Sequence, residues 1–239
     1  MIRLKTKFAF LLVAVATITL SHAQDRFDSQ VADLMLLQAK PIQKAIGVTE
    51  AQRAELNKLA AAHRQKVEAF FQEEQKKKVN PATITPSNPT IVGYFAELQA
   101  KAFKTLTASQ LRRLRELTLQ RAGTPAILIP DVSQRLKITS AQTSTIRTAV
   151  SSFQTFASTS AQTVANGVLS QYKNVKPKDQ ADAKRLRAEL DSKLRTAETK
   201  LHPRIVAAQK IMDRKIELSL SAAQLKAWHS LLGQPFAFR

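Results

Sequence analysis

Residues 106–110 read L-T-A-S-Q, and variants of this phrase occur at three other places in the chain. The other copies read V-T-E-A-Q at residues 48–52, I-T-S-A-Q at 138–142 and L-S-A-A-Q at 220–224. In each copy a Thr or Ser is followed three residues later by Gln, which is the spacing of a helix capping box. The hydroxyl accepts from the backbone N–H of the Gln, whose side chain accepts from the N–H of the capping residue. The phrase therefore predicts four helix starts, capped by Thr49 and Gln52, Thr107 and Gln110, Thr139 and Gln142, and Ser221 and Gln224.

The four copies alternate between two contexts. The flanks of the first copy match those of the third at an offset of 90 residues, and the flanks of the second match those of the fourth at an offset of 114. Ile42 thus corresponds to Val132, and Leu114 to Trp228. This order predicts two tandem units, over residues 24–123 and 131–239. The apolar residues between prolines at 124–130 are expected to form a non-helical connector.

The rest of the chain favours an all-α protein built from elongated antiparallel helical hairpins. Only five Gly are present, and no run of residues alternates convincingly between apolar and polar side chains. Residues 25–40 are expected to form a short amphipathic helix. Prolines in 80–89 and at Pro177 mark two hairpin tips. Pro203 is expected to kink or divide the long helix predicted over residues 179–218.

The N-terminus has the three parts of a secretory signal. Basic residues precede a largely apolar run at 8–20, and small residues at Ser21 and Ala23 flank a predicted cleavage site before Gln24. We therefore expect a periplasmic or secreted protein without a membrane span in its mature chain. The sequence contains no Cys, which excludes disulfides, thiolate catalysis and cysteine metal ligands.

The chain is strongly basic. Removing residues 1–23 takes away three basic residues and no acidic one, which leaves a formal net charge of +16. This charge favours anionic partners, such as acidic or unfolded proteins or anionic envelope components. Export makes a nucleic-acid partner unexpected.

Catalytic and metal-binding patterns are sparse. His63 lies on an apolar helical stripe, His202 has Glu198 four residues before it, and His229 follows Trp228. A His–carboxylate pair is only half of a zinc site. The chain has no zincin, phosphate-binding or nucleophile-elbow motif. We therefore expect no enzyme activity, no cofactor and no metal site.

Exposed apolar patches rimmed by charge are typical of interaction sites, although Phe at helical spacing is more often part of a core. The long outgoing helices of both units carry Phe side chains interleaved with basic ones. The candidate client-binding residues are Arg64, Lys66, Phe70, Phe71, Arg147, Phe153 and Phe156.

The four motifs resemble the LTxxQ-motif family, the Spy- and CpxP-like periplasmic stress proteins. The resemblance covers the motifs and their flanks, about half of the chain, although V-T-E-A-Q and L-S-A-A-Q depart from the pattern. It implies an ATP-independent chaperone in which one chain carries two subunit equivalents as a pseudo-dimer. Two alternatives stay open: a metal-responsive protein of the same family, and a binder of anionic envelope polymers.

Overall fold

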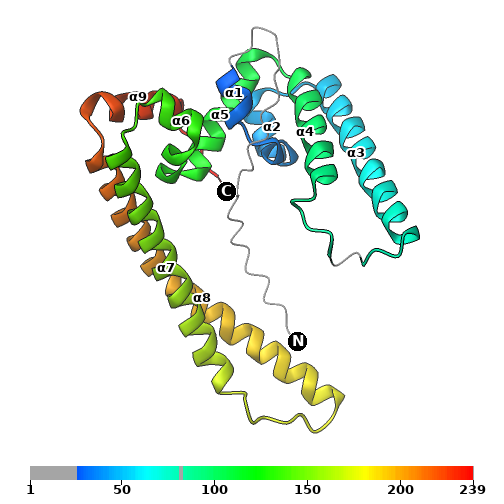
Figure 1. The fold of residues 1–239 in the computed structure, drawn as a ribbon. Helices are drawn as coiled ribbons and strands as arrows, with labels where there is room; N and C mark the ends of the chain where they lie inside the picture. The colour runs from blue at the N-terminus through cyan, green and yellow to red at the C-terminus, as the bar shows by residue number, and fades with distance from the viewer. Residues whose placement is uncertain (1–25, 81–82, 239) are drawn as a thin grey trace. The chain divides into compact units, whose positions relative to one another are not determined.

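The structure is a computed structural model that describes residues 26–80 and 83–238. The described residues form nine α-helices and two five-residue 3-10 helices, with no strand among them (Figure 1). The predicted all-α class is therefore confirmed. Contacts within the chain divide it into unit 1, residues 1–118, and unit 2, residues 119–239, and each is described by itself. The predicted signal peptide falls in residues 1–25, outside the described residues.

Unit 1 begins with three short helices and continues into a hairpin. The short helices are α1 (Arg26–Val31), η1 (Leu34–Gln38) and α2 (Lys40–Ile46). The hairpin consists of α3 (Glu50–Lys76) and α4 (Pro89–Lys104), which lie side by side (Figure 1). The next helix, α5 (Ala108–Ala122), crosses the boundary between the units.

The single helix predicted over residues 25–40 is wrong, because α1 and η1 are separate elements. Asp33 lies between them, and its carboxylate accepts from the backbone N–H of Met35 at 2.8 Å. The Asp33 N–H donates to the Thr118 hydroxyl of α5, also at 2.8 Å. A side chain that bonds nearby backbone competes with the helical ladder, so the first helix ends before Asp33.

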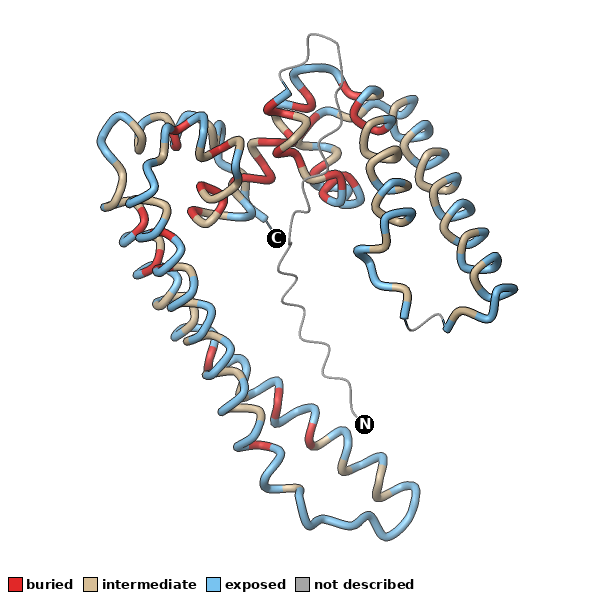
Figure 2. Tube along the Cα trace, in the orientation of Figure 1, coloured by how far each residue is buried: buried red, intermediate tan, exposed pale blue. Residues whose placement is uncertain are grey.

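The core of unit 1 lies in its short helices and in α5 (Figure 2). Leu111, Leu114 and Leu117 of α5 are almost completely buried. In the hairpin, α3 has no fully buried residue, and α4 buries only Ala102 and Phe103 near its C-terminal end. The hairpin is therefore a thin arm that extends from a small core.

A buried ion pair joins the first helix of unit 1 to α5. Arg115 Nε lies 3.0 Å from Asp28 Oδ1, and the two side chains are only 7% and 9% exposed. The guanidinium also lies 5.3 Å from the centre of the Phe27 ring. An ion pair this deep contributes to stability only while both partners are present.

Unit 2 repeats the plan with a longer hairpin. Two short helices, η3 (Thr124–Leu128) and α6 (Pro130–Arg135), precede α7 (Ser140–Ser170), α8 (Gln180–Ser219) and α9 (Ala222–Leu232). Figure 1 shows α7 and α8 side by side as an antiparallel pair. Pro203 does not divide α8, which is one helix of 40 residues. Figure 1 shows this helix changing direction along its length, as a proline without an N–H would allow.

The prediction that residues 124–130 are non-helical is wrong. Residues 124–128 form the 3-10 helix η3, which contacts α6, α7 and α8 and belongs to the core of unit 2. Pro125 stands in its first turn, where a missing N–H costs nothing. Ile127 is completely buried, and the Thr124 hydroxyl donates to Asp213 Oδ1 of α8 at 2.6 Å.

A hydrogen bond in unit 1 has a counterpart in unit 2 between residues that each lie 90 positions later in the chain. In unit 1 the Gln43 side chain donates to the Leu37 carbonyl, and in unit 2 the Ser133 hydroxyl donates to the Ile127 carbonyl. A left-handed residue follows each short helix: Gly47, directly after α2, has φ 70°, and Lys137, two residues after the end of α6, has φ 53°. This conformation turns the chain into the capped helix that follows.

Lys137→Gly should raise the free energy of unfolding by about 0.5–1 kcal/mol, because a left-handed Lys is strained and Gly is not. The reverse test in unit 1, Gly47→Ala, should lower it by about 1 kcal/mol. A Cβ at Gly47 would meet no atom within 4 Å, so that loss would report backbone conformation alone. Urea denaturation of both variants measures the two changes. A loss of stability in Lys137→Gly would contradict the left-handed assignment.

Candidate functional site: paired glutamines and exposed helix faces

Each motif starts a helix with a complete capping box. The capping residues Thr49, Thr107, Thr139 and Ser221 donate their N–H to the Gln Oε1 at 2.8–3.0 Å. In return each hydroxyl accepts from the Gln N–H at 3.2 Å. The eight predicted capping residues thus all take part in the reciprocal bonds of a box.

The two motifs of unit 1 also bind each other. Gln52 Nε2 donates to Gln110 Oε1 at 2.8 Å, and Gln110 Nε2 donates back to Gln52 Oε1 at 2.9 Å. Each amide has a second acceptor: Gln52 reaches the Thr105 carbonyl and Gln110 the Gly47 carbonyl, both at 2.7 Å. These carbonyls lie two residues before the capping residue of the opposite motif.

Unit 2 contains the same arrangement. Gln142 and Gln224 exchange amide hydrogen bonds of 2.7 and 3.0 Å. Gln142 also donates to the Ser219 carbonyl at 2.8 Å, and Gln224 to the Lys137 carbonyl at 3.1 Å. The acceptors again lie two residues before the opposite capping residue. The carbonyl of the left-handed residue, Gly47 or Lys137, therefore accepts from the side-chain amide of the Gln in the opposite motif.

This pair of reciprocal hydrogen bonds between side-chain amides requires Gln at both positions. Each Gln must accept at Oε1 from its own box and from its partner, and must donate both amide hydrogens. A Glu would complete the capping box but has no hydrogens to donate. Capping alone therefore does not explain why all four copies carry Gln. That absence of Glu was the available signal for the pairing, which the sequence analysis missed.

The pairing closes the base of each hairpin. It joins the start of the outgoing helix to the start of the last helix, across 58 residues in unit 1 and 82 in unit 2. All of the hydrogen-bonding groups of these amides are used within the protein. The motifs therefore form structural clasps, and the predicted client-binding residues lie on the helix faces beyond them.

The predicted client-binding residues of unit 1 all lie on α3 but in different environments. Arg64 is exposed, whereas Phe70 is half-buried and packs edge-on against Phe71, with ring centres 5.7 Å apart. Phe71 is 37% exposed. Lys66 is already engaged across the hairpin, with Nζ 2.6 Å from Glu97 Oε2 and 5.9 Å from the centre of the Tyr94 ring.

Glu97 receives a second ammonium group, since Lys101 Nζ lies 2.7 Å from its Oε1. Hydrogen bonds from Lys101 and Lys66 lower the pKa of Glu97 from 4.5 to about 2. A lowered folded-state pKa means that this stabilisation is complete above pH 4.5 and is lost as the pH falls through about 2. Because the carboxyl side chain is 39% exposed, water and salt weaken the contribution.

We expect an NMR titration of the Glu97 carboxyl carbon to show a midpoint well below 4.5. Lys101→Met should raise that midpoint, and Lys66→Met should raise it by a smaller amount, because the Lys101 bond is the larger cause. Lys104→Met provides a control, since Lys104 makes no ion pair with Glu97. A Glu97 midpoint near 4.5 would show that neither bridge forms in solution.

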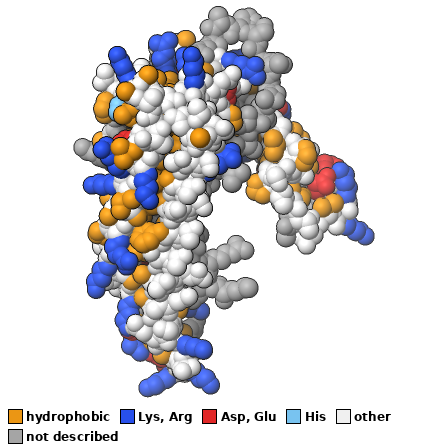
Figure 3. Space-filling model, turned by 60° about the vertical axis from the view of Figure 1, so that its left-hand side comes forward, with side chains coloured by type: hydrophobic (Ala, Val, Ile, Leu, Met, Phe, Trp, Pro, Cys, Tyr) orange, Lys and Arg blue, Asp and Glu red, His pale blue; other side chains and the backbone are white. Residues whose placement is uncertain are grey.

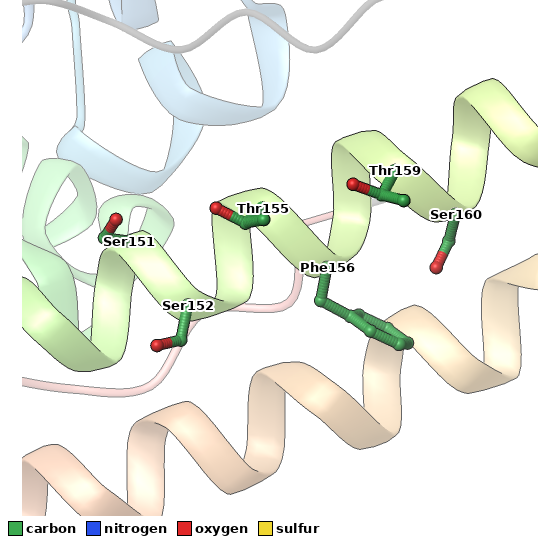
Figure 4. A pocket seen from close by; sticks show the side chains of 6 residues that line it. All are labelled: Ser151, Ser152, Thr155, Phe156, Thr159 and Ser160. Atoms are coloured by element: carbon green, nitrogen blue, oxygen red, sulfur yellow. The ribbon is translucent and has the colours of Figure 1, made fainter.

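The predicted residues of unit 2 lie on α7. Arg147 is exposed, and Phe153 and Phe156 are half-buried. Figure 4 shows the Phe156 ring directed toward the neighbouring helix, while Ser151 and Thr155 lie on another side of α7. Phe156 thus contributes mainly to the packing of the hairpin. Arg147 is the only charged residue of α7, whose outer face is otherwise rich in Ser and Thr.

The most exposed large apolar residues are ones that the sequence analysis did not select. Ile211 is 59% and Leu218 is 68% exposed on α8. They are seven residues apart, two helical turns, and so share a face. Figure 3 shows hydrophobic side chains and Lys or Arg side chains interspersed along the long hairpin of unit 2. The i, i+7 spacing was visible in the sequence, but there it could not be distinguished from a core stripe.

Metal ligands do not gather in the part of the chain that the structure describes: no group of three or more His, Asp or Glu is placed to hold an ion there. His202 and His229 are exposed. His63 is half-buried, and its Nδ1 has no hydrogen-bond partner among the described residues. Of the helices in residues 26–80 and 83–238, none has both the length and the hydrophobicity of a membrane span.

Comparisons with protein-family models, with curated proteins and with solved structures return no match for this chain.

Proposed function

We propose that the protein is an ATP-independent holdase of the cell envelope that binds unfolded, acidic proteins. The observation that carries this proposal is the exposure of large apolar side chains on the long helices of a strongly basic chain. Phe71 and Phe95 are exposed on the hairpin of unit 1, and Leu169, Ile211 and Leu218 on that of unit 2. Exposed apolar side chains among charges are typical of protein interaction surfaces.

The physical properties of this surface suggest a two-step binding mode. Positive charge attracts acidic segments over a distance, and salt screens that attraction beyond about 8 Å at physiological ionic strength. Burial of apolar side chains then holds the client without requiring a fixed sequence. We therefore infer weak, salt-sensitive and sequence-tolerant binding.

The resemblance to the LTxxQ-motif family supports the same function. We propose that the chain carries two subunit equivalents of that family in tandem, as a pseudo-dimer. The repetition of the glutamine clasp in both units supports this proposal, because each unit pairs its own two motifs. Residues 1–23 would direct the protein to the envelope and be removed there.

The proposal is tested by the aggregation of an unrelated denatured protein, followed by light scattering without ATP. We expect the purified protein to suppress aggregation, and added salt to weaken that suppression. Phe71→Ser should speed client release more than it slows capture, because it removes an apolar contact and no charge. Phe153→Ser tests a half-buried Phe for comparison and should mainly affect stability. Failure to suppress aggregation at low salt would reject the holdase function.

The metal-responsive alternative makes a different prediction. Calorimetry would then show stoichiometric binding of zinc or copper that depends on His63 or His202. Tight metal binding without salt-dependent client protection would favour that alternative over the holdase.

A further inference from the structure

An open groove of about 720 Å³ lies between α7 and α8 of unit 2. Its α7 side is lined by small side chains, among them Ser144, Thr148 and Ala149. Its α8 side is formed by Lys215, Leu218 and Ser219. The groove lies beside the glutamine clasp, because the Ser219 carbonyl accepts from Gln142. A volume of this size has room for several side chains of a bound peptide.

The groove has an apolar rim that extends along α8. Leu218 lines the groove directly, and Ile211 continues the same helix face two turns away. Both side chains are more than half exposed, so both would lose contact with water when a ligand binds. Small residues opposite them leave space for a large aliphatic side chain.

Cationic side chains outnumber carboxylates on the stretch of α8 beside this groove, and Lys215 lines the groove itself. Lys210, Arg214 and Lys215 are exposed on α8, and no ion pair is found for any of them within the described residues. α7 contains no Asp or Glu. On α8 the nearby Asp213 accepts from the Thr124 hydroxyl. Glu217 lies two turns from Lys210 on the same face of α8, turned away from Lys215. A carboxylate on a bound ligand would therefore meet unpaired cations.

The corresponding face of unit 1 has a different character. At the offset of 114 residues, Lys104 stands where unit 2 has Leu218, and Glu97 stands where it has Ile211. Glu97 is bound by lysines of its own unit. On the outgoing helix, Lys58 stands where unit 2 has Thr148. The apolar and cationic face is thus a property of unit 2 and not of the shared repeat.

We propose that this groove is a docking site for acidic peptide segments that carry large aliphatic side chains. The aliphatic side chains lie against Leu218 and Ile211, and the flanking carboxylates lie against Arg214 and Lys215. This inference rests on the proposed holdase function, because it identifies the client segments and the surface that receives them.

Fluorescence anisotropy with a labelled peptide rich in Leu and Glu tests the site. The protein should bind this peptide more tightly than a peptide with Lys in place of each Glu, or one with Ser in place of each Leu. Ile211→Ser combined with Leu218→Ser should weaken binding about tenfold or more. Arg214→Glu combined with Lys215→Glu should weaken it and reduce its dependence on salt. Leu169→Ser, an exposed aliphatic of α7 outside the groove, is the matched control and should change the Kd less than twofold.

The outcomes for the site and for the holdase are distinguishable. Suppression of aggregation together with equal peptide binding by the wild type and the Ile211/Leu218 variant would overturn the site while the holdase stands. Groove-dependent peptide binding without suppression of aggregation would support the site and reject the holdase. An equal loss of peptide affinity in the Leu169→Ser variant would also overturn the site, because any exposed apolar residue of the hairpin would then be enough to bind the peptide. Circular dichroism shows whether each variant keeps its helices.

Discussion

Arg115→Ala is expected to lower the free energy of unfolding by about 3–5 kcal/mol. The substitution leaves the Asp28 carboxylate buried without its cation, and it removes the guanidinium from the face of Phe27. The cost of an uncompensated buried charge is larger than the value of the pair itself. Denaturation in urea measures the change, and the same loss is expected from Asp28→Ala.

Two further variants separate charge burial from simple loss of a side chain. Arg112→Ala removes an exposed Arg from the same helix and should change stability by no more than about 0.5 kcal/mol. The double variant Asp28→Leu with Arg115→Met removes both charges and should recover most of the loss. If Arg115→Ala proved as mild as Arg112→Ala, the pair would not be buried in the folded protein.

The helices and their starts could be predicted from the sequence because their causes are local. A hydroxyl and a Gln three residues apart define a helix start, and the left-handed Gly47 ends the helix before it. Local sequence rules predicted the structure less well where tertiary contacts determine the conformation of the backbone. Residues 124–128 form a 3-10 helix, with Ile127 buried and contacts to α7 and α8, although Pro125 lies in the segment and Pro130 follows it.

The candidate surface was harder to predict for a related reason. Apolar residues at helical spacing look alike whether they face a partner helix or water. Phe156 was selected as a surface residue, yet its ring lies toward α8, whereas Leu218 was not selected and is the most exposed large apolar residue described. Only the placement of the second helix of each hairpin distinguishes the two cases.

Gln110→Glu is expected to lower the free energy of unfolding by about 2–4 kcal/mol. The carboxylate cannot donate to Gln52 or to the Gly47 carbonyl, so it leaves acceptors facing each other without hydrogens at a buried position. Gln142→Glu should have the same effect in unit 2 through Gln224 and Ser219. Thr107→Ala, which removes one capping bond and keeps the pair, should cost only about 1 kcal/mol.

The sign of this change decides between two explanations of the motif. If the Gln served only as a capping residue, Glu would replace it without loss, and its charge near the helix N-terminus would even be slightly favourable. If the glutamines pair, the Gln110→Glu substitution should instead lower the free energy of unfolding. Pairing also predicts that the deficit shrinks as the pH falls, because a protonated Glu regains one donor and the folded variant then binds the proton more readily than the unfolded chain. Gln154→Glu on the exposed face of α7 controls for the added charge, and urea denaturation at two pH values measures all of these variants. If the Gln110→Glu protein were as stable as the wild type, the four glutamines would act only as helix caps. The hydrogen bonds shared by the two clasps would then contribute nothing to stability.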